Sequence, residues 1–301
     1  MFSCSQECID YITSRIILGI IFEPLSWPKP GNVGPLKYYH DLTLEDFIEA
    51  SIILYPKLRT LISNEAMNRN YRLCYWMKEL VSTISNNLNK NVILGTLILL
   101  TPIAIGLSKH CDEYCKSEIV SVEKIISWSN ESLERSYLEN ASDFLKAIAI
   151  SKASIPSYKG PFPSVNEETY IFLRDFINIC SKWDMICYEL NSGFKLTIYI
   201  AKRINDLVEN GLRLTKAIAK VYLEVLAETI DTHIVRRHSI TQAIRTKLLV
   251  KLITEYQRND LLESLDEELR QRRINPGTIA DLVAIATVLY LLSRPKTPII
   301  S

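Results

Sequence analysis

Apolar residues recur at helical spacing along most of the chain. In the first segment, Ile9, Ile12 and Ile16 fall three or four residues apart, which is the spacing of one face of an α-helix. The same spacing predicts helices over residues 5–21, 43–56, 73–84, 91–107, 118–129, 132–150, 168–190, 196–209, 215–229, 241–257, 259–272 and 278–292. No segment alternates apolar and polar residues as a half-buried strand does. The pattern therefore predicts an all-α fold.

Two of these segments are apolar on every side. Residues 92–107 are interrupted by Pro102, and residues 279–292 carry Asp281 near their start. Both are shorter than the roughly 20 residues that a membrane-spanning helix needs, so we expect no membrane partner. A helix that is apolar all round lies inside a core. We therefore expect one large multi-helix domain over residues 1–301, with these two helices buried at its centre.

Composition supports this interpretation and narrows the range of partners. Glycine is scarce, at 9 of 301 residues, and 48% of the residues are hydrophobic, which is enough for a sizeable core. A net charge of +1 argues against nonspecific binding to nucleic acid, which requires a basic face. The seven cysteines are an odd number and follow no signal peptide, which favours a reducing cytoplasm.

Four of the cysteines form pairs with a spacing of four residues. One pair is Cys4 and Cys8, and the other is Cys111 and Cys115. Together with His110, the second pair resembles a set of metal ligands. No second pair matches it at the spacing of a zinc site, so the sequence does not favour a metal there.

One break in the helical pattern has the composition of an anion site. Residues 27–33 read Trp-Pro-Lys-Pro-Gly-Asn-Val, and each proline fixes φ and removes a backbone donor. The result is a stiff connector that presents the cation of Lys29 beside Gly31, where a ligand can approach the backbone closely. A different break, rich in proline, marks a boundary or lid near residues 151–168.

A further break, Asn-Pro-Gly-Thr at residues 275–278, precedes the last helix. Backbone N–H groups at such a helix start point outward and suit a phosphate. The alternative is that Asp281 only caps this helix. Standard phosphate-binding loops are missing from the sequence, so a phosphate site would have to use helix starts and single cations.

Acidic side chains also follow a regular spacing. Glu224, Glu228 and Asp231 fall at i, i+4 and i+7, which places them along one face of a predicted helix. Aligned carboxylates repel each other unless they are solvated, paired or bridged by a cation, and Mg²⁺ takes carboxylate and phosphate oxygens as ligands. The alternative is a solvated acidic face that pairs with Arg236 and Arg237.

Several short motifs, taken together, resemble one enzyme family. In chain order they are Pro-Lys-Pro-Gly-Asn-Val at 28–33, His-Asp at 40–41, Glu-Leu-Asn-Ser-Gly-Phe at 189–194, Asp-Thr at 231–232 with Arg-Arg at 236–237, and Asn-Pro-Gly-Thr-Ile-Ala-Asp-Leu at 275–282. They are similar to motifs of the triphosphoribosyl-dephospho-CoA synthase family. The resemblance implies an all-α enzyme with ATP as substrate. In the family reaction, the 2′-hydroxyl of 3′-dephospho-CoA attacks the ATP ribose at C1′ and displaces adenine.

The resemblance and the carboxylate spacing together assign roles to residues. Asp41, Glu189 and Asp231 are expected to be catalytic, and Asp231 and Glu228 are expected to bind Mg²⁺. The residues expected to bind the nucleotide and its phosphates are Lys29, Gly31, Asn32, His40, Asn91, Arg236, Arg237, Asn275, Gly277, Thr278 and Asp281. We also predict that Lys29 and Asp281 face each other across one pocket. The expected partners are ATP and dephospho-CoA or a related acceptor, and a homo-oligomer is left open.

One motif departs from the family pattern. Where bacterial members tend to carry Asn-Thr-His-Lys-Gly, residues 91–95 read Asn-Val-Ile-Leu-Gly, so Ile93 and Leu94 replace a histidine and a lysine. This places the sequence closer to the archaeal branch. The alternative interpretation is therefore a non-catalytic, all-α nucleotide-binding or scaffold protein that kept the family fold.

Overall fold

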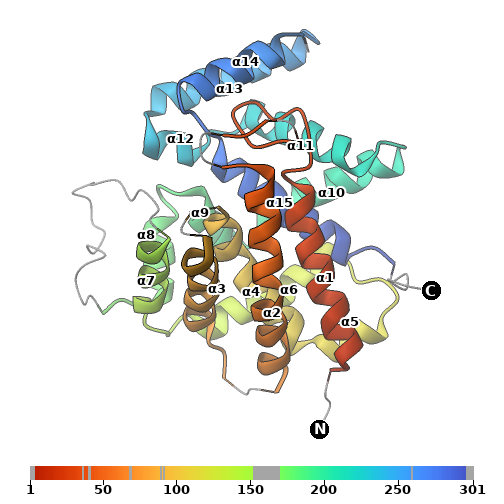
Figure 1. Ribbon diagram of the computed structural model, residues 1–301. Helices are drawn as coiled ribbons and strands as arrows, with labels where there is room; N and C mark the ends of the chain where they lie inside the picture. The colour runs from red at the N-terminus through yellow and green to blue at the C-terminus, as the bar shows by residue number, and fades with distance from the viewer. Residues whose placement is uncertain are drawn as a thin grey trace.

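The computed structural model of the chain consists of α-helices (Figure 1). It describes residues 4–35, 37–39, 42–67, 70–88, 90, 92–151, 170–258 and 260–295. Within these ranges there are 15 helices, and the only β-type pairings are isolated bridges. The prediction of an all-α fold is confirmed. The proline-rich segment expected to be a boundary or lid lies almost entirely outside the described residues.

The helices range in length from 6 to 24 residues. They are α1 (Gln6–Phe22), α2 (Leu44–Met67), α3 (Leu73–Leu88), α4 (Leu94–Lys109), α5 (Cys111–Lys116), α6 (Val122–Ser136), α7 (Ser142–Ile150), α8 (Leu173–Cys180), α9 (Met185–Ser192), α10 (Lys195–Glu209), α11 (Leu214–Glu228), α12 (Thr232–Arg237), α13 (Ile240–Glu255), α14 (Asp260–Gln271) and α15 (Gly277–Leu292).

The two helices that are apolar on every side, α4 and α15, lie in the core, as predicted. Nearly all residues of both are buried, because other helices surround them. Helix α1 packs against α15 at Gly19, where a Cβ would lie 2.6 Å from the Cα of Val288. In the described part of the chain, no helix combines the length and the apolar content that crossing a membrane requires.

Three predicted helix boundaries are wrong. Helix α2 continues through Pro56 to Met67, because Leu54, Leu58 and Leu61 on both sides of the proline are buried, and their packing outweighs one lost backbone bond. The break predicted between the helices at 118–129 and 132–150 lies further along the chain, because α6 continues to Ser136 and α7 begins at Ser142. The helix predicted over 168–190 is divided into α8 and α9, because the Asp184 side chain caps the start of α9.

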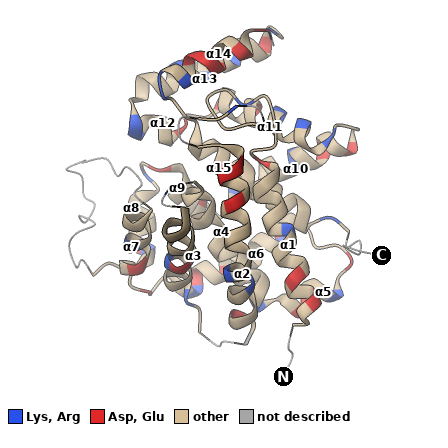
Figure 2. Cartoon of the chain, viewed as in Figure 1, with Lys and Arg blue, Asp and Glu red and all other residues tan. Residues whose placement is uncertain are grey.

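Different helices form the two ends of the helix bundle. In Figure 1, α13 and α14 lie at the top of the view, and the start of α1 lies beside α5 at the bottom. Lys, Arg, Asp and Glu are interspersed over the helices in this view (Figure 2), consistent with the net charge of +1. In Figure 1, the connector that follows α1 lies toward the top of the view, near α11 and the start of α15.

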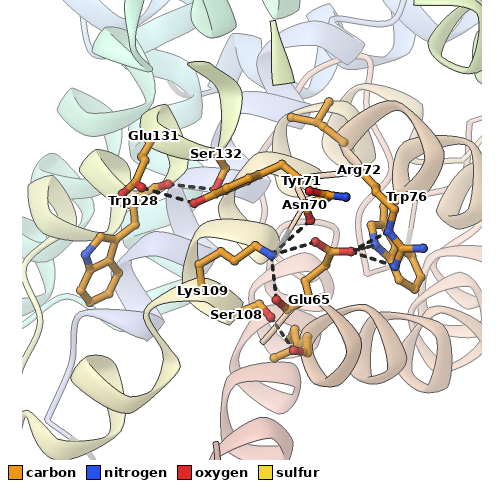
Figure 3. Close-up of polar contacts among 12 residues, drawn as sticks. Glu65, Asn70, Tyr71, Arg72, Trp76, Ser108, Lys109, Trp128, Glu131 and Ser132 are labelled. Carbon is orange, nitrogen blue, oxygen red and sulfur yellow. Dashed lines mark hydrogen bonds and ion pairs between the residues drawn. The ribbon is translucent and has the colours of Figure 1, made fainter. Parts of the chain in front are cut away.

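A buried polar network fixes the C-terminal end of α4 (Figure 3). The carboxylate of Glu65 in α2 accepts hydrogen bonds from Trp76 Nε1 at 2.7 Å and from Arg72 Nη2 at 2.9 Å. Lys109, the last residue of α4, places its ammonium 3.2 Å from the second Glu65 oxygen. A buried charge requires such partners, so this network holds α2, α3 and α4 in one arrangement.

Folding brings six of the seven cysteines together in pairs. The structure pairs Cys4 with Cys111, Cys8 with Cys115, and Cys180 with Cys187, whereas Cys74 is free and buried. Spacing along the chain does not reveal that two of these pairs meet, because it is folding that brings the start of α1 against α5.

Candidate functional site

The connector after α1 lies against the turn between α14 and α15. Gly31 has a φ of 77°, and its N–H donates to Asp266 Oδ1 at 2.8 Å. A Cβ on Gly31 would lie 2.7 Å from the carbonyl oxygen of Ile274, so glycine permits both the backbone angle and this close approach. Arg270 of α14 donates to the carbonyl oxygen of Asn32. The structure therefore brings together the two chain breaks that the sequence singled out.

Lys29 is buried beneath the connector rather than presented to a ligand. Its side chain is fully buried, and its ammonium forms an ion pair with Glu23 and lies 5.8 Å from the ring centroid of Tyr222. Burial lowers the pKa of Lys29 and raises the pKa of Glu23. The expectation that the connector exposes this cation is wrong, because the ammonium neutralises a buried carboxylate.

The carboxylate of Asp231 caps two helices at once. It is buried; Oδ1 accepts from the N–H of Ile234 in α12, and Oδ2 accepts from the N–H of Ile279 in α15, both at 2.9 Å. Burial raises its pKa to about 6, and the backbone N–H groups oppose that rise. Asp231 therefore fixes the start of α15 relative to α12.

The predicted row of three carboxylates does not exist as one helix face. Helix α11 ends at Glu228, and the chain then becomes extended at Thr229, so Asp231 lies outside that helix. Glu228 is exposed and pairs with Lys251 at 3.0 Å, while Glu224 pairs with Arg203 at 2.9 Å. The helix-face argument for Asp231 and Glu228 as joint metal ligands is therefore wrong.

Asp281, one turn into α15, reaches the start of α4. Its Oδ1 accepts from the N–H of Thr96 at 2.9 Å and from the Thr96 hydroxyl at 2.6 Å. A Cβ on Gly95 would lie 2.2 Å from Asp281 Oδ2, so only glycine leaves room for this carboxylate. Burial raises the pKa of Asp281 to about 7; the Thr96 bonds lower it, and the charges of Glu23 and Asp231 raise it further.

Glu23 is the group through which Lys29 and Asp281 interact. It pairs with Lys29, and its charge also raises the pKa of Asp281. The two predicted residues therefore belong to one electrostatic cluster. Their direct approach across a pocket stays a prediction.

Arginines gather on one side of this cluster. Arg237, Arg270 and Arg273 all favour the ionised form of Tyr39, although burial still raises the pKa of Tyr39 to about 12. Arg237 and Arg273 are exposed and form no ion pair with a described acidic residue. Arg236 instead pairs with the Asp184 carboxylate, and it lies close enough to Asp281 for the two charges to interact.

The remaining predicted residues lie in different parts of the structure. Glu189 is fully buried in α9 and accepts from the N–H of Thr197 at 2.7 Å, so it caps α10 and does not join the cluster. Thr278 Oγ1 accepts from the N–H of His233 at 3.0 Å, and Gly277 packs against the His233 ring. Among the described residues, none donates a hydrogen bond to the buried Oδ1 of Asn275.

Asn32 has a similar buried atom, because its Nδ2 has no hydrogen-bond partner in the described ranges. His40, Asp41 and Asn91 lie outside the described residues, so their predicted roles stay predictions.

His233, which packs against Gly277, has a lowered pKa. Burial, aided by the charges of Arg237 and His238, lowers this pKa to about 4, so the imidazole is neutral at pH 7.

Sequence reasoning missed several members of the cluster. They are Glu23, Asp184, Tyr222, Asp266, Arg270 and Arg273. The spacing of Asp266 and Arg270, four residues apart, could have revealed one ion pair. The others are distant from one another in the chain, and no local pattern marks them.

The described carboxylates do not form a ready Mg²⁺ site. Both oxygens of Asp231 accept backbone N–H bonds, and Glu228 lies elsewhere, on Lys251. Clusters of possible metal ligands in the described ranges all contain cysteine rather than carboxylates alone. Cysteine thiolates do not suit Mg²⁺, which takes oxygen ligands.

The fold and the site define an all-α protein in which buried carboxylates and arginines gather around the start of one helix. Such an arrangement suits a nucleotide triphosphate. The family described as ATP:dephospho-CoA triphosphoribosyl transferase matches residues 9–298, and the chain belongs to that family. It is a transferase that moves the triphosphoribosyl group of ATP to dephospho-CoA.

A crystal structure of a candidate triphosphoribosyl-dephospho-CoA synthase from Archaeoglobus fulgidus has a similar fold. The TM-score is 0.61 at 20% sequence identity, covering 83% of this chain and 100% of the other. No curated protein sequence matches the chain. The family match favours the enzyme over the non-catalytic scaffold.

The buried ion pair gives a first prediction. Lys29→Met should lower the free energy of unfolding by about 3–5 kcal/mol, because it leaves Glu23 buried without its cation. The double variant Glu23→Gln with Lys29→Met should recover most of this loss. Urea denaturation at pH 7 measures both. A double variant as unstable as Lys29→Met would contradict a structural role for the pair.

Proposed function

We propose that Asp281 is the general base of the transfer. The observation that carries this proposal is a partly buried carboxylate with a pKa of about 7, held by Thr96 at the start of α4. A general base works best with a pKa near the working pH. In the described ranges, only Oδ1 of Asp281 accepts hydrogen bonds, which leaves Oδ2 for a substrate hydroxyl.

The chemical step balances with this assignment. The 2′-oxygen of dephospho-CoA bonds to C1′ of the ATP ribose, and the bond from C1′ to the adenine nitrogen breaks. The hydroxyl proton passes to Asp281, and the adenine nitrogen that leaves C1′ takes a proton from water. Asp231 differs from Asp281 because both its oxygens accept backbone bonds. We therefore give Asp231 a positioning role, in which it fixes the helix that carries Asp281.

We propose that Arg237 and Arg273 bind the triphosphate. Both are exposed beside Tyr39, and guanidinium groups form paired, charge-assisted hydrogen bonds with phosphate oxygens. The unpartnered buried atoms of Asn32 and Asn275 would serve the nucleotide. Mg²⁺ would then arrive as part of the ATP complex, bound by the phosphates rather than by a carboxylate site of the protein. We place the enzyme in the cytoplasm, where ATP is available.

A second prediction tests the base. With ATP and dephospho-CoA, adenine release followed by chromatography should give a kcat/KM that rises with pH through about 7, because Asp281 must lose its proton. Asp281→Asn should lower kcat by roughly 10²- to 10⁴-fold and abolish this rise. Thr96→Val should move the rise to higher pH, because it removes a hydrogen bond that stabilises the carboxylate. An unchanged profile in Asp281→Asn would refute the assignment.

A third prediction tests the phosphate site. Arg237→Gln and Arg273→Gln should each raise KM for ATP by about 10- to 100-fold, since a hydrogen bond to a charged group contributes about 1.5–3 kcal/mol. The matched control is Arg258→Gln, an exposed arginine that pairs with Asp260. KM for ATP should stay unchanged in the control, and equal effects in all three variants would argue against a local site.

We propose that the enzyme is a dimer through α13. Ile240, Ile244, Leu248 and Leu252 follow one another at intervals of four residues and are 40–50% exposed. The row continues into an apolar groove between α13 and α14. Rows of this spacing on two helices interlock, so the same face on a second copy fits it.

A fourth prediction follows from this row. Leu248→Glu should convert the dimer to a monomer, because it places a charge in the apolar contact. Light scattering after size exclusion measures the mass. Tyr199→Glu, an exposed aromatic on α10, is the control and should leave the mass unchanged. A wild-type monomer would refute the proposal.

A further inference from the structure

Four cysteines converge at the end of the molecule opposite the candidate active site. Cys8 lies in the first turn of α1 and Cys4 just before that helix, whereas Cys111 and Cys115 belong to α5. Their four sulfur atoms all lie within 4.8 Å of one another. The structure joins them crosswise as Cys4–Cys111 and Cys8–Cys115, so each pair links the same two segments.

The spacing of the sulfurs fits one tetrahedral metal ion. With zinc–sulfur bonds of about 2.3 Å, the sulfurs of a tetrahedral site lie roughly 3.8 Å apart. Sγ of Cys111 lies 3.7 Å from Sγ of Cys115 and 4.0 Å from Sγ of Cys8. Reduction of the two cross-links and separation of their sulfurs, to the spacing that Cys111 already has with Cys8 and Cys115, would place all four sulfurs around one ion.

The surroundings also favour a metal over two separate cross-links. Both cross-links join residues 107 positions apart, so the second closes almost the same loop as the first and adds little further chain entropy. Cys111 is buried, and Cys4 and Cys8 are almost so, which limits access of water to the cluster. Helix α1 directs its positive N-terminal end toward Cys4 and Cys8, which stabilises thiolates.

We propose that Cys4, Cys8, Cys111 and Cys115 bind one Zn²⁺ in the reduced protein. Four sulfur–zinc bonds form, the thiols release their protons to water, and no electron is transferred. The site is structural: the ion ties the start of α1 to α5. Cys111 follows the far end of α4, about 24 Å along that 16-residue helix from Gly95. The proposal is therefore independent of the chemistry assigned to Asp281.

The test uses the full chain, reduced with a thiol reagent and freed of metal with a chelator under anaerobic conditions. Titration with Zn²⁺ should give one bound equivalent and a higher Tm. Co²⁺ in place of Zn²⁺ should give the intense visible absorption of tetrahedral thiolate coordination. A reagent that modifies free thiols should react with four fewer of the seven cysteines after Zn²⁺ is added.

Two double variants separate this site from the other cysteines. Cys8→Ser with Cys115→Ser should lose the bound equivalent and the rise in Tm. Cys180→Ser with Cys187→Ser removes the remaining pair and should retain both. If the first variant fails to fold, the Co²⁺ spectrum of the wild-type protein still decides the matter. Absence of that spectrum, or equal Zn²⁺ binding by both variants, would overturn the proposal.

Discussion

The candidate site depends on the buried carboxylate of Asp231. Its two oxygens hold the first turns of α12 and α15 together, and each of those turns would otherwise leave backbone N–H groups unpaired inside the protein. The cost of an unpaired buried donor is about 1–3 kcal/mol, so this double cap strongly favours one arrangement. Because Arg236 lies on α12 and Asp281 on α15, the same carboxylate sets the distance between a cation and the proposed base.

Acidic groups are concentrated around this cap, and their pKa values show the consequence. Glu23, Asp231 and Asp281 all have raised pKa values, because burial penalises each charge. The three carboxylates differ in the groups that stabilise their charge. Glu23 has the cation of Lys29, and Asp231 has backbone donors on both oxygens. Within the described residues, Asp281 accepts from Thr96 alone, through two donors on one oxygen. It is therefore the carboxylate best able to take up a proton near neutral pH.

The sequence predicted the parts of the fold that depend on local pattern. The apolar runs of α4 and α15 identified the core helices, and the breaks at residues 27–33 and 275–278 do meet in space. It failed where tertiary packing decides. Pro56 continues a helix because its neighbours are buried, and the extended backbone after Glu228 breaks a carboxylate row that spacing alone made continuous. The partners of the site residues are spread along the chain from Glu23 to Arg273, and no single stretch of sequence records them.

Helix α4 explains why Ile93 and Leu94 do not by themselves imply a lost active site. The start of this helix lacks a capping side chain of its own, since Ile93 cannot accept a hydrogen bond through its side chain. Asp281 supplies the cap from α15, and the missing Cβ of Gly95 gives it room. The far end of α4 is fixed by Glu65 and by the segment that carries the α5 cysteines. With both ends held, the helix keeps the carboxylate at one position, which is what a residue that transfers a proton requires.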